Sequence, residues 1–532
     1  MMDDKSQLTW EEVSEEDDGD PGYENFSRID FNLWTDDPSV LRASEDLVSG
    51  LKGHKTLNRT CMMVLLLNLY RCWLMDETKW LAYMRGKDRY CLCRKYNKND
   101  ISWTGLTRSV DHLISLDHIE HKIGFYFRGV VVEKGKCSRA RLRGSFADLL
   151  ESEYGFTDSV IRRHPQEEVV ILKDTDKIPI DYKDTNHNDA DGKRKFLKRY
   201  NELLEGTYID LDAGDYKAKE SMWVDLSRKH CYRVFNNGKK TLIHGGRFYG
   251  GWWQGIPSEL RLKIIINNMK VVECDYSGIH INLLYAKEGI DFNCLGKDAY
   301  QLPEYDITRE YRNFFKVLLL AALNAKNDGL AKKAINRKFN KTPYKFPSEK
   351  PNLDEAIKHF KNYHSPIAHH FFKGVGHALM NTDAKIAEYV LRKMTEQDIP
   401  VLSVHDSFIC PKIHEDSLIS SMREAFSRHC GFSLERAIRF YRESESPIKR
   451  ARPSRVPRVN ITYEEHSTNE ALGVYSDDFM VDLTSINDSR LVNRIMNYDH
   501  NGEIAKYVSI PIEKEPEVPS MRIVPRRELI VH

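Results

Sequence analysis

The stretch VVECDYSGIHINLLYAKEG, residues 271 to 289, is the most informative part of the sequence for predicting the fold. Its β-branched start predicts a short strand that ends at Asp275. Ile279, Leu283 and Ala286 then recur at i, i+4 and i+7, which is the spacing of one helix face. Asp275 is therefore expected at the carboxyl end of a strand, directly before a helix, where its carboxylate can face a ligand.

A second carboxylate follows in IPVLSVHDSFICP, residues 399 to 411. The pattern predicts two short strands joined by a tight turn at His405 and Asp406. Two unpaired carboxylates at turns of one sheet would repel each other and shift their pKa values. Mg²⁺ prefers such oxygen ligands and keeps waters for a phosphate substrate, so the pair suggests a divalent-metal site.

Composition limits the class of protein. A chain of 532 residues is expected to form two or three domains. Its 80 basic and 79 acidic residues give a net charge of +1, so any nucleic-acid-binding surface must be local. No apolar run reaches the ~18 residues of a membrane span, and the acidic start is unlike a signal peptide. The ten cysteines contain no CxxC pair, and a cytoplasmic location without a membrane partner is expected.

The N-terminal part predicts a tail and a small domain. Residues 1 to 44 are acidic and lack apolar periodicity, which predicts a disordered tail. Residues 45 to 150 predict a mainly helical domain whose helix and two-stranded wing, over 119 to 125, resemble a winged helix. Arg139 and Arg141 follow in an extended stretch and would contact phosphates. The alternatives are solvated arginines or a protein-interaction module.

The middle and the end of the chain are less informative. Residues 151 to 227 predict a helical, thumb-like connector with an amphipathic helix over 193 to 206. A glycine-rich stretch then contains GGRFY, residues 245 to 249. It predicts either a backbone that approaches a bulky ligand or a hairpin that packs its tryptophans inward. Residues 441 to 532 predict a basic linker and a C-terminal extension.

TREYRNFFKVLLLAALNAK, residues 308 to 326, predicts a long helix. Arg312, Lys316 and Asn324 are separated by multiples of four and share one side of it. Arg312 and Lys316, one turn apart, would suit the oxygens of a triphosphate. The alternative is a helix with two cations that only extend into solvent.

The segment from 326 to 350 is basic and interleaved with aromatic residues. This composition favours a groove that follows a nucleic-acid backbone, and a solvated basic loop is the alternative. The cations assigned to this groove are Lys332, Lys333, Arg337 and Lys338.

Together, four stretches resemble the palm and fingers of family A DNA polymerases and phage-type single-subunit RNA polymerases, over roughly 230 to 415. DYSGIHINLLYA resembles motif A, the helix with Arg312 and Lys316 resembles motif B, and VHDSF resembles motif C. GGRFY is similar to the strand that meets the template–product duplex. The resemblance implies an α+β fold: a right-hand polymerase palm with an antiparallel sheet and helical fingers over 228 to 440, preceded by the winged-helix-like domain.

The resemblance also implies roles for single residues. Asp275 and Asp406 would hold two Mg²⁺ ions, for which Mn²⁺ could substitute. Arg312 and Lys316 would bind the incoming nucleoside triphosphate, and His405 would lie against the growing 3′ end of a DNA or RNA template-primer. The further contacts implied are Tyr276, His280 and Asn324 for the substrate and Arg247 for the duplex.

Four positions depart from the family pattern. Asn324 and Ala325 replace the Tyr-Gly pair of motif B, and Ser407 replaces the second acid of motif C. His280 stands where DNA polymerases carry a glutamate that excludes a 2′-hydroxyl, and its bulk favours deoxynucleotides. We expect a template-directed nucleotidyltransferase of a mobile or viral element, with DNA polymerase favoured. The alternatives are a single-subunit RNA polymerase or primase, a non-catalytic DNA-binding replication protein on a degenerate palm, and a metal-dependent nuclease.

Overall fold

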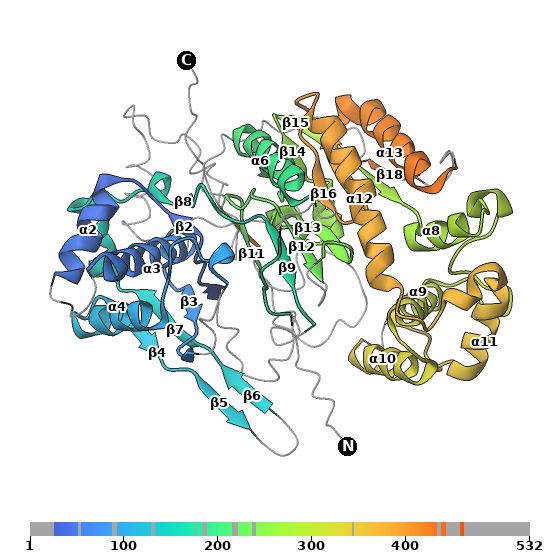
Figure 1. The fold of residues 1–532 in the computed structure, drawn as a ribbon, viewed down its shortest axis with the longest axis horizontal. Coiled ribbons are helices and arrows are strands. Elements are labelled where there is room, and N and C mark those ends of the chain that lie inside the picture. The colour runs from blue at the N-terminus through green and yellow to red at the C-terminus, as the bar shows by residue number, and fades with distance from the viewer. Residues whose placement is uncertain are drawn as a thin grey trace, which may run out of the picture.

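The computed structural model describes the larger part of the chain as a mixed α+β protein (Figure 1). The predicted C-terminal extension lies almost wholly outside the described residues, as do the first 25 residues of the predicted tail. The residues that the structure describes are 26–49, 51, 55–87, 93–128, 133–175, 177–183, 189–214, 222–236, 241–342, 345–432, 438–442 and 458–461.

One hydrophobic core belongs to the N-terminal part, drawn in blue and cyan in Figure 1. Every residue of its central helix from Cys61 to Tyr70 is buried, so this part of the helix is surrounded by other elements on all sides. The helices are α2 (Pro38–Val48), α3 (Lys55–Met75), α4 (Trp103–Ser115) and α5 (Gly144–Ser152). They pack with a sheet of order β1 (Phe26–Arg28), β3 (Trp80–Tyr83), β7 (Ser138–Leu142) and β4 (Ile119–Lys122).

Residues 26 to 44, which we assigned to a disordered tail, are part of this N-terminal core. They form β1, the start of α2 and the short strand β2 (Leu33–Trp34), which pairs with β8 (Arg162–Arg163). Apolar side chains such as Val40 and Ala43 are fully buried there. The acidic composition that suggested disorder stops at residue 25.

The wing predicted over 119 to 125 is not formed as expected. Strand β4 pairs with β7, and Ile119 faces Leu142 in the core. The hairpin lies further along the chain, where β5 (Phe125–Arg128) pairs with β6 (Glu133–Lys136). The registers of these two pairs are continuous, so β4–β5 and β6–β7 form the two arms of one longer hairpin, and the turn predicted at His121 and Lys122 is not formed.

The second core holds the middle and the C-terminal half of the described chain. The predicted helix over 193 to 206 is α6 (Ala190–Gly206). A three-stranded sheet lies beside it, with β13 (Gly245–Tyr249), β12 (Tyr232–Asn236) and β9 (Val170–Lys173) in that order. The predicted connector contributes to both cores, since Val160 belongs to the first and Leu197 to the second.

The glycine-rich stretch packs its tryptophans inward. Trp252 and Trp253 are both buried. Gly246 has φ +94°, and a Cβ there would lie 2.5 Å from the ring of Phe235. Glycine is therefore required at this position because the backbone packs closely against the buried ring of Phe235, and not because a ligand approaches it.

The central sheet of the second core carries both predicted carboxylates. Its strands are antiparallel neighbours in the order β10 (Ile209–Leu211), β14 (Ile264–Ile266), β15 (Met269–Tyr276), β17 (Ser407–Pro411) and β16 (Leu402–Val404). A further strand, β18 (Ile438–Arg442), pairs with the other edge of β15. The strand predicted to end at Asp275 is formed and runs one residue further, to Tyr276, and the hairpin predicted around Asp406 is confirmed.

Helices complete this half of the protein. Figure 1 shows α12 running from the central sheet to the group formed by α9, α10 and α11. The helices are α8 (Ile279–Lys287), α9 (Arg309–Asn324), α10 (Asp328–Lys341), α11 (Leu353–Tyr363), α12 (Gly376–Thr395) and α13 (Glu415–Cys430). None of the helices in the described ranges is long and apolar enough to cross a membrane.

The remaining elements are short. The last strand pair is β11 (Met222–Asp225) with β19 (Arg458–Ile461), and α7 covers Ser258–Arg261. The 3₁₀ turns are η2 (Arg94–Tyr96), η3 (Asp158–Val160), η4 (Trp252–Gln254), η5 (Phe292–Leu295), η7 (Ser365–His370) and η8 (Lys412–His414).

Candidate active site

Asp275 and Asp406 lie on adjoining backbone segments at one end of the central sheet. Asp275 is in register with Ser407, the residue that follows Asp406. The Tyr276 amide donates a hydrogen bond to the Asp406 carbonyl oxygen at 3.2 Å. The turn itself is tight, because His405 adopts a left-handed φ of +59°. The sequence predicted two carboxylates at turns of one sheet, and the structure shows that the strand with Asp275 directly contacts the turn with Asp406.

The two carboxylates are buried and influence each other. Burial raises the pKa of Asp275, Asp406 and Glu273 raise it further, and the result is about 8. Burial likewise raises the pKa of Asp406, although Arg247 opposes the shift. Within the described ranges, neither carboxylate has a salt-bridge partner. The pair therefore offers oxygen ligands whose charge is incompletely balanced, which is a donor set that fits a hard divalent cation.

A third carboxylate, Glu273, lies two residues before Asp275 and has its charge balanced. Its Oε1 accepts a hydrogen bond from Ser407 Oγ at 2.5 Å and lies 3.0 Å from Arg261 Nη1. Strand residues two apart point to the same face, so Glu273 and Asp275 share a side of β15. Ser407, which replaces an acid of the family pattern, is thus hydrogen-bonded to an acid supplied by the neighbouring strand.

Cations from α9 and β18 lie near the carboxylate pair. Lys316 and Arg439 lower the pKa of Asp275, although burial and the acidic neighbours outweigh them. Arg439 is the cross-strand neighbour of Asp275 on β18. Burial lowers the pKa of Lys316, and Arg312 lowers it further. Lys316, on the helix face predicted to bind phosphates, is therefore close enough to Asp275 for the two charges to interact.

Arg312 already has a carboxylate partner. Its Nη1 is ion-paired with Asp298, and its guanidinium lies 4.9 Å from the ring centroid of Tyr300. Lys316 Nζ lies 5.7 Å from the same ring. Burial raises the pKa of Tyr300 to about 12. A phosphate that reached Arg312 would have to compete with Asp298.

Asp383, on α12, connects two of the predicted contact residues. Its Oδ2 accepts hydrogen bonds from Arg247 Nη2 at 2.5 Å and from His280 Nε2 at 2.8 Å. Burial alone would raise the pKa of this carboxyl, but the bonds from His280 and Arg247 lower it. Only 3% of the Asp383 side chain is exposed, so it is a charged buried acceptor that orients both partners.

His405 lies within the electrostatic influence of Arg247. Burial lowers its pKa to about 4, and the nearby Arg247 charge acts in the same direction. Its ring meets the ring of Tyr249 edge-on, with centroids 6.0 Å apart. The imidazole is therefore neutral at neutral pH.

Two of the substrate contacts implied by the resemblance have other partners. Tyr276 is 2% exposed, and its hydroxyl donates to the Met422 carbonyl oxygen at 2.6 Å. Since it follows Asp275 on a strand, its side chain points to the face of β15 opposite to that of Asp275. Asn324 is exposed, but its Nδ2 donates to the Leu320 carbonyl oxygen of its own helix, 2.8 Å away.

Apart from Arg247, the predicted nucleic-acid contacts lie in two places. On α10, Lys332 is ion-paired with Asp354 of α11. Arg141 on β7 donates to Glu120 at 2.7 Å and lies over the ring of Trp80. This ion pair holds β7 to β4. Lys333, Arg337 and Lys338 lie on the exposed side of α10, and Arg139 lies on the same face of β7 as Arg141.

Sequence reasoning missed Glu273, Asp298, Asp383 and Arg439. Asp383 had a detectable signal: it lies four residues before Ala387, on the buried stripe of α12, where an acid without a partner is rare. Arg439 had none, because only the pairing of β18 with β15 brings it to Asp275.

Comparison with protein-family models and with curated proteins finds no match. Among solved structures, the chain is similar to the POL domain of Pol1 from M. smegmatis, in complex with a DNA primer-template and dNTP. The sequence identity is 14%, the match covers 48% of this chain and 52% of that chain, and the TM-score is 0.26. The match thus spans about half of that structure, and a similarity of this size contributes nothing to the assignment below.

Proposed function

We propose that this chain is a template-directed nucleotidyltransferase that extends a nucleic-acid strand, with deoxynucleotides as its preferred substrates. One observation carries the proposal: Asp275 and Asp406 adjoin at the end of the central sheet, and Lys316 of α9 lies close enough to act on Asp275. Buried carboxylates beside cations suit metal-assisted phosphoryl transfer, in which the protein mainly positions the reactants and balances charge.

Asp275 and Asp406 would hold the metal ions. When bound there, two Mg²⁺ ions would stabilise charge on the attacking and leaving oxygens of an in-line displacement. Glu273 is balanced by Arg261 and Ser407, so it supports the electrostatics of the pair without being needed as a ligand.

The cations of α9 would bind the incoming triphosphate. Arg312 would exchange Asp298 for phosphate oxygens, and its planar guanidinium can bind two of them at once. Lys316 would add a compact charge one helical turn away. Tyr300 lies beside both cations and provides a flat surface at this position.

The Asp383 cluster would contact the primer–template. Arg247 gives Asp383 two of its five N–H donors, at Nε and Nη2, and the others remain for a phosphate. His280 is fixed by the same carboxylate, so its bulk is held in one position near the sugar. His405, being neutral, would lie against the 3′ end without adding charge.

The test is an extension assay with dNTPs and NTPs in parallel, on primed and unprimed DNA and RNA templates, with Mg²⁺ or Mn²⁺. Wild-type protein is expected to lengthen a labelled primer, and Asp406→Asn and Asp275→Asn should reduce the rate by at least ~1,000-fold while binding of the primer–template persists. Asp148→Asn, an exposed aspartate of α5, is the matched control and should extend normally.

The other outcomes distinguish the alternatives. Extension with NTPs, or without a primer, would indicate an RNA polymerase or primase. Shortening of the labelled strand would indicate a nuclease. If the wild type extends no primer under any of these conditions, the proposal is wrong and a non-catalytic binding protein becomes the better assignment.

A further inference from the structure

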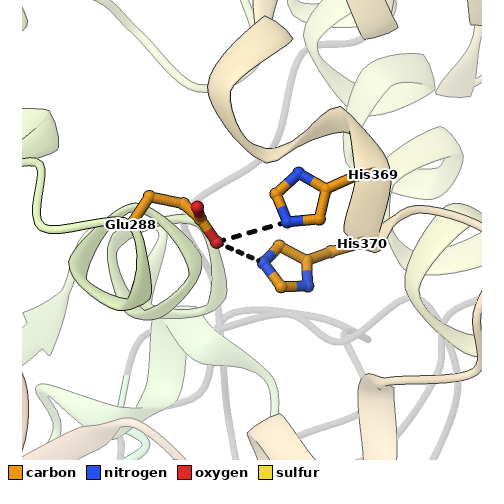
Figure 2. Close-up of side chains that lie close together, drawn as sticks. All are labelled: Glu288, His369 and His370. Atoms are coloured by element: carbon orange, nitrogen blue, oxygen red, sulfur yellow. Dashed lines mark hydrogen bonds and ion pairs between the residues drawn. The ribbon is translucent and has the colours of Figure 1, made fainter.

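A second cluster of ligand-type side chains lies outside the candidate active site. Glu288, His369 and His370 come together where the end of α8 meets η7, and their ligand atoms all lie within 4.8 Å of one another (Figure 2). Glu288 Oε1 lies 3.3 Å from His369 Nε2 and 2.7 Å from His370 Nε2. Figure 2 shows both imidazoles directed at the same carboxylate oxygen.

The convergence of two neighbouring histidines is unusual for their backbone. His369 and His370 are consecutive residues of a 3₁₀ turn, where successive side chains point about 120° apart. Their rings nevertheless lie 4.0 Å apart and present Nε2 to one acceptor. A single surface ion pair would need only one of them.

The backbone that presents these side chains is held in place by buried contacts. Tyr285, one turn before Glu288, has its hydroxyl 3.2 Å from His364 Nδ1, and both residues are fully buried. His364 directly precedes η7, and Ile367 and Phe371 anchor that turn in the core. The three ligand-type groups therefore project from rigid elements, which reduces the entropy that binding an ion would cost.

We propose that Glu288, His369 and His370 bind a first-row divalent cation of the zinc type. Two imidazole nitrogens and one carboxylate oxygen form a donor set that suits Zn²⁺ and its neighbours and that a hard cation such as Mg²⁺ does not prefer. Tetrahedral ligation requires neighbouring donors roughly 3.3 Å apart, given metal–ligand bonds of about 2.0–2.1 Å. The observed separations need only a small adjustment to meet this value.

Binding has a defined proton balance. Each imidazole must offer the Nε2 lone pair, so its remaining proton resides on Nδ1, and any proton shared with Glu288 Oε1 is released to solvent. The site is open, because 59% of the His369 side chain and 31% of the Glu288 side chain are exposed. Water can fill the fourth position. The bound ion would join α8, which follows Asp275, to the turn that links α11 with α12.

The experiment uses the full chain, freed of metal with a chelator, and titrates it with Zn²⁺ by calorimetry. Cobalt(II) absorption is a second readout, because its visible bands report nitrogen and oxygen ligands. The protein carries Asp275→Asn and Asp406→Asn, so that ions at the candidate active site do not contribute. This protein is expected to bind one equivalent of Zn²⁺. The further double substitution His369→Ala and His370→Ala should weaken Zn²⁺ binding about 10- to 100-fold.

Two further variants separate ligation from folding. Glu288→Gln keeps the size and the hydrogen bonding of the side chain but weakens it as a ligand, so Zn²⁺ affinity should fall while the chelated protein melts like its parent. Cys294→Ser, at an exposed thiol, is the matched control and should bind normally. A parent protein, with Asp275→Asn and Asp406→Asn alone, that takes up no Zn²⁺, or unchanged affinity in the histidine variant, would overturn the proposal. Because no step requires extension activity, the result is independent of the proposed function.

Discussion

At the scale of single residues, Asp383 connects Arg247 and His280, which we propose to contact the duplex and the sugar. The sequence presents Arg247 and His280 as separate residues with separate roles. In the structure, one buried carboxylate oxygen accepts from both, so neither side chain is oriented independently of the other. Asp383 is therefore a positioning residue, and its removal should affect two functions together.

Asp383→Asn is expected to lower the extension rate by about 10- to 100-fold and to reduce discrimination between dNTPs and NTPs. The amide keeps the shape but loses the charge that holds Arg247 and His280, a loss of the order of 1.4–2.7 kcal/mol. Single-nucleotide incorporation gives kcat and KM for both sugars. His280→Ala should change the sugar ratio in the same direction. An unchanged ratio in Asp383→Asn would mean that the residue has only a structural role.

Glu273 offers a second prediction at this scale. Its charge lies on the same face of β15 as Asp275 and adds negative potential to the carboxylate pair. Glu273→Gln should therefore raise the Mg²⁺ concentration for half-maximal extension by about tenfold, or ~1.4 kcal/mol. Ser407→Ala leaves this charge in place and should have a smaller effect. Equal Mg²⁺ dependence in wild type and Glu273→Gln would contradict the argument.

At the scale of elements, β15 shows how far sequence reasoning could go. The strand, its end at Asp275 and the hairpin at Asp406 were predictable, because their patterns are local. The alternation of a strand also places Tyr276 on the face opposite to Asp275, whereas the substrate contact of Tyr276 was implied by the resemblance alone. The pairing of β18 with β15 joins distant segments and leaves no local pattern. The hairpin that β4 and β5 form with β6 and β7 is local, but it is longer than the one that the sequence predicts.

The long helix α12 connects the same elements through buried charges. Arg233 of β12 is fully buried and ion-paired with Glu388 of α12, which also binds Arg392 with an Nη2–Oε1 distance of 2.7 Å. Burial alone would raise the pKa of Glu388, but Arg233 and Arg392 lower it to about 2. This ion pair fixes α12 against the strand next to Arg247, so α12 positions Asp383 as well.

Glu388→Gln should destabilise the second core by about 3–5 kcal/mol at pH 7, because it leaves Arg233 buried without a counter-charge. A depressed carboxyl pKa adds stability that is present above its unfolded value of 4.5 and is lost as the pH falls toward 2. The difference between wild type and variant should therefore shrink between pH 4.5 and 2. Urea unfolding across this range measures it, and a difference that does not change with pH would contradict the assignment.

At the scale of the whole molecule, Tyr96 links the two cores. Tyr96 belongs to the second core, although Tyr83 before it and Ile101 after it both belong to the first core. The Tyr96 hydroxyl donates to the Ile180 carbonyl oxygen at 2.9 Å and accepts from the Leu172 amide at 3.0 Å. A side chain from the N-terminal sequence thus completes the hydrogen bonding of β9 in the other core.

Tyr96→Phe should lower the stability of the second core by about 1–3 kcal/mol, because the buried Leu172 amide loses its acceptor while the ring still fills its space. Hydrogen exchange followed by mass spectrometry should show faster exchange in β9 and unchanged protection in α3. Tyr70→Phe is the matched control, since Tyr70 donates to the Phe156 carbonyl oxygen inside the first core and should loosen only that core. If both variants loosened both cores equally, the two would form one cooperative unit, and the separation of the N-terminal part from the candidate active site would be wrong.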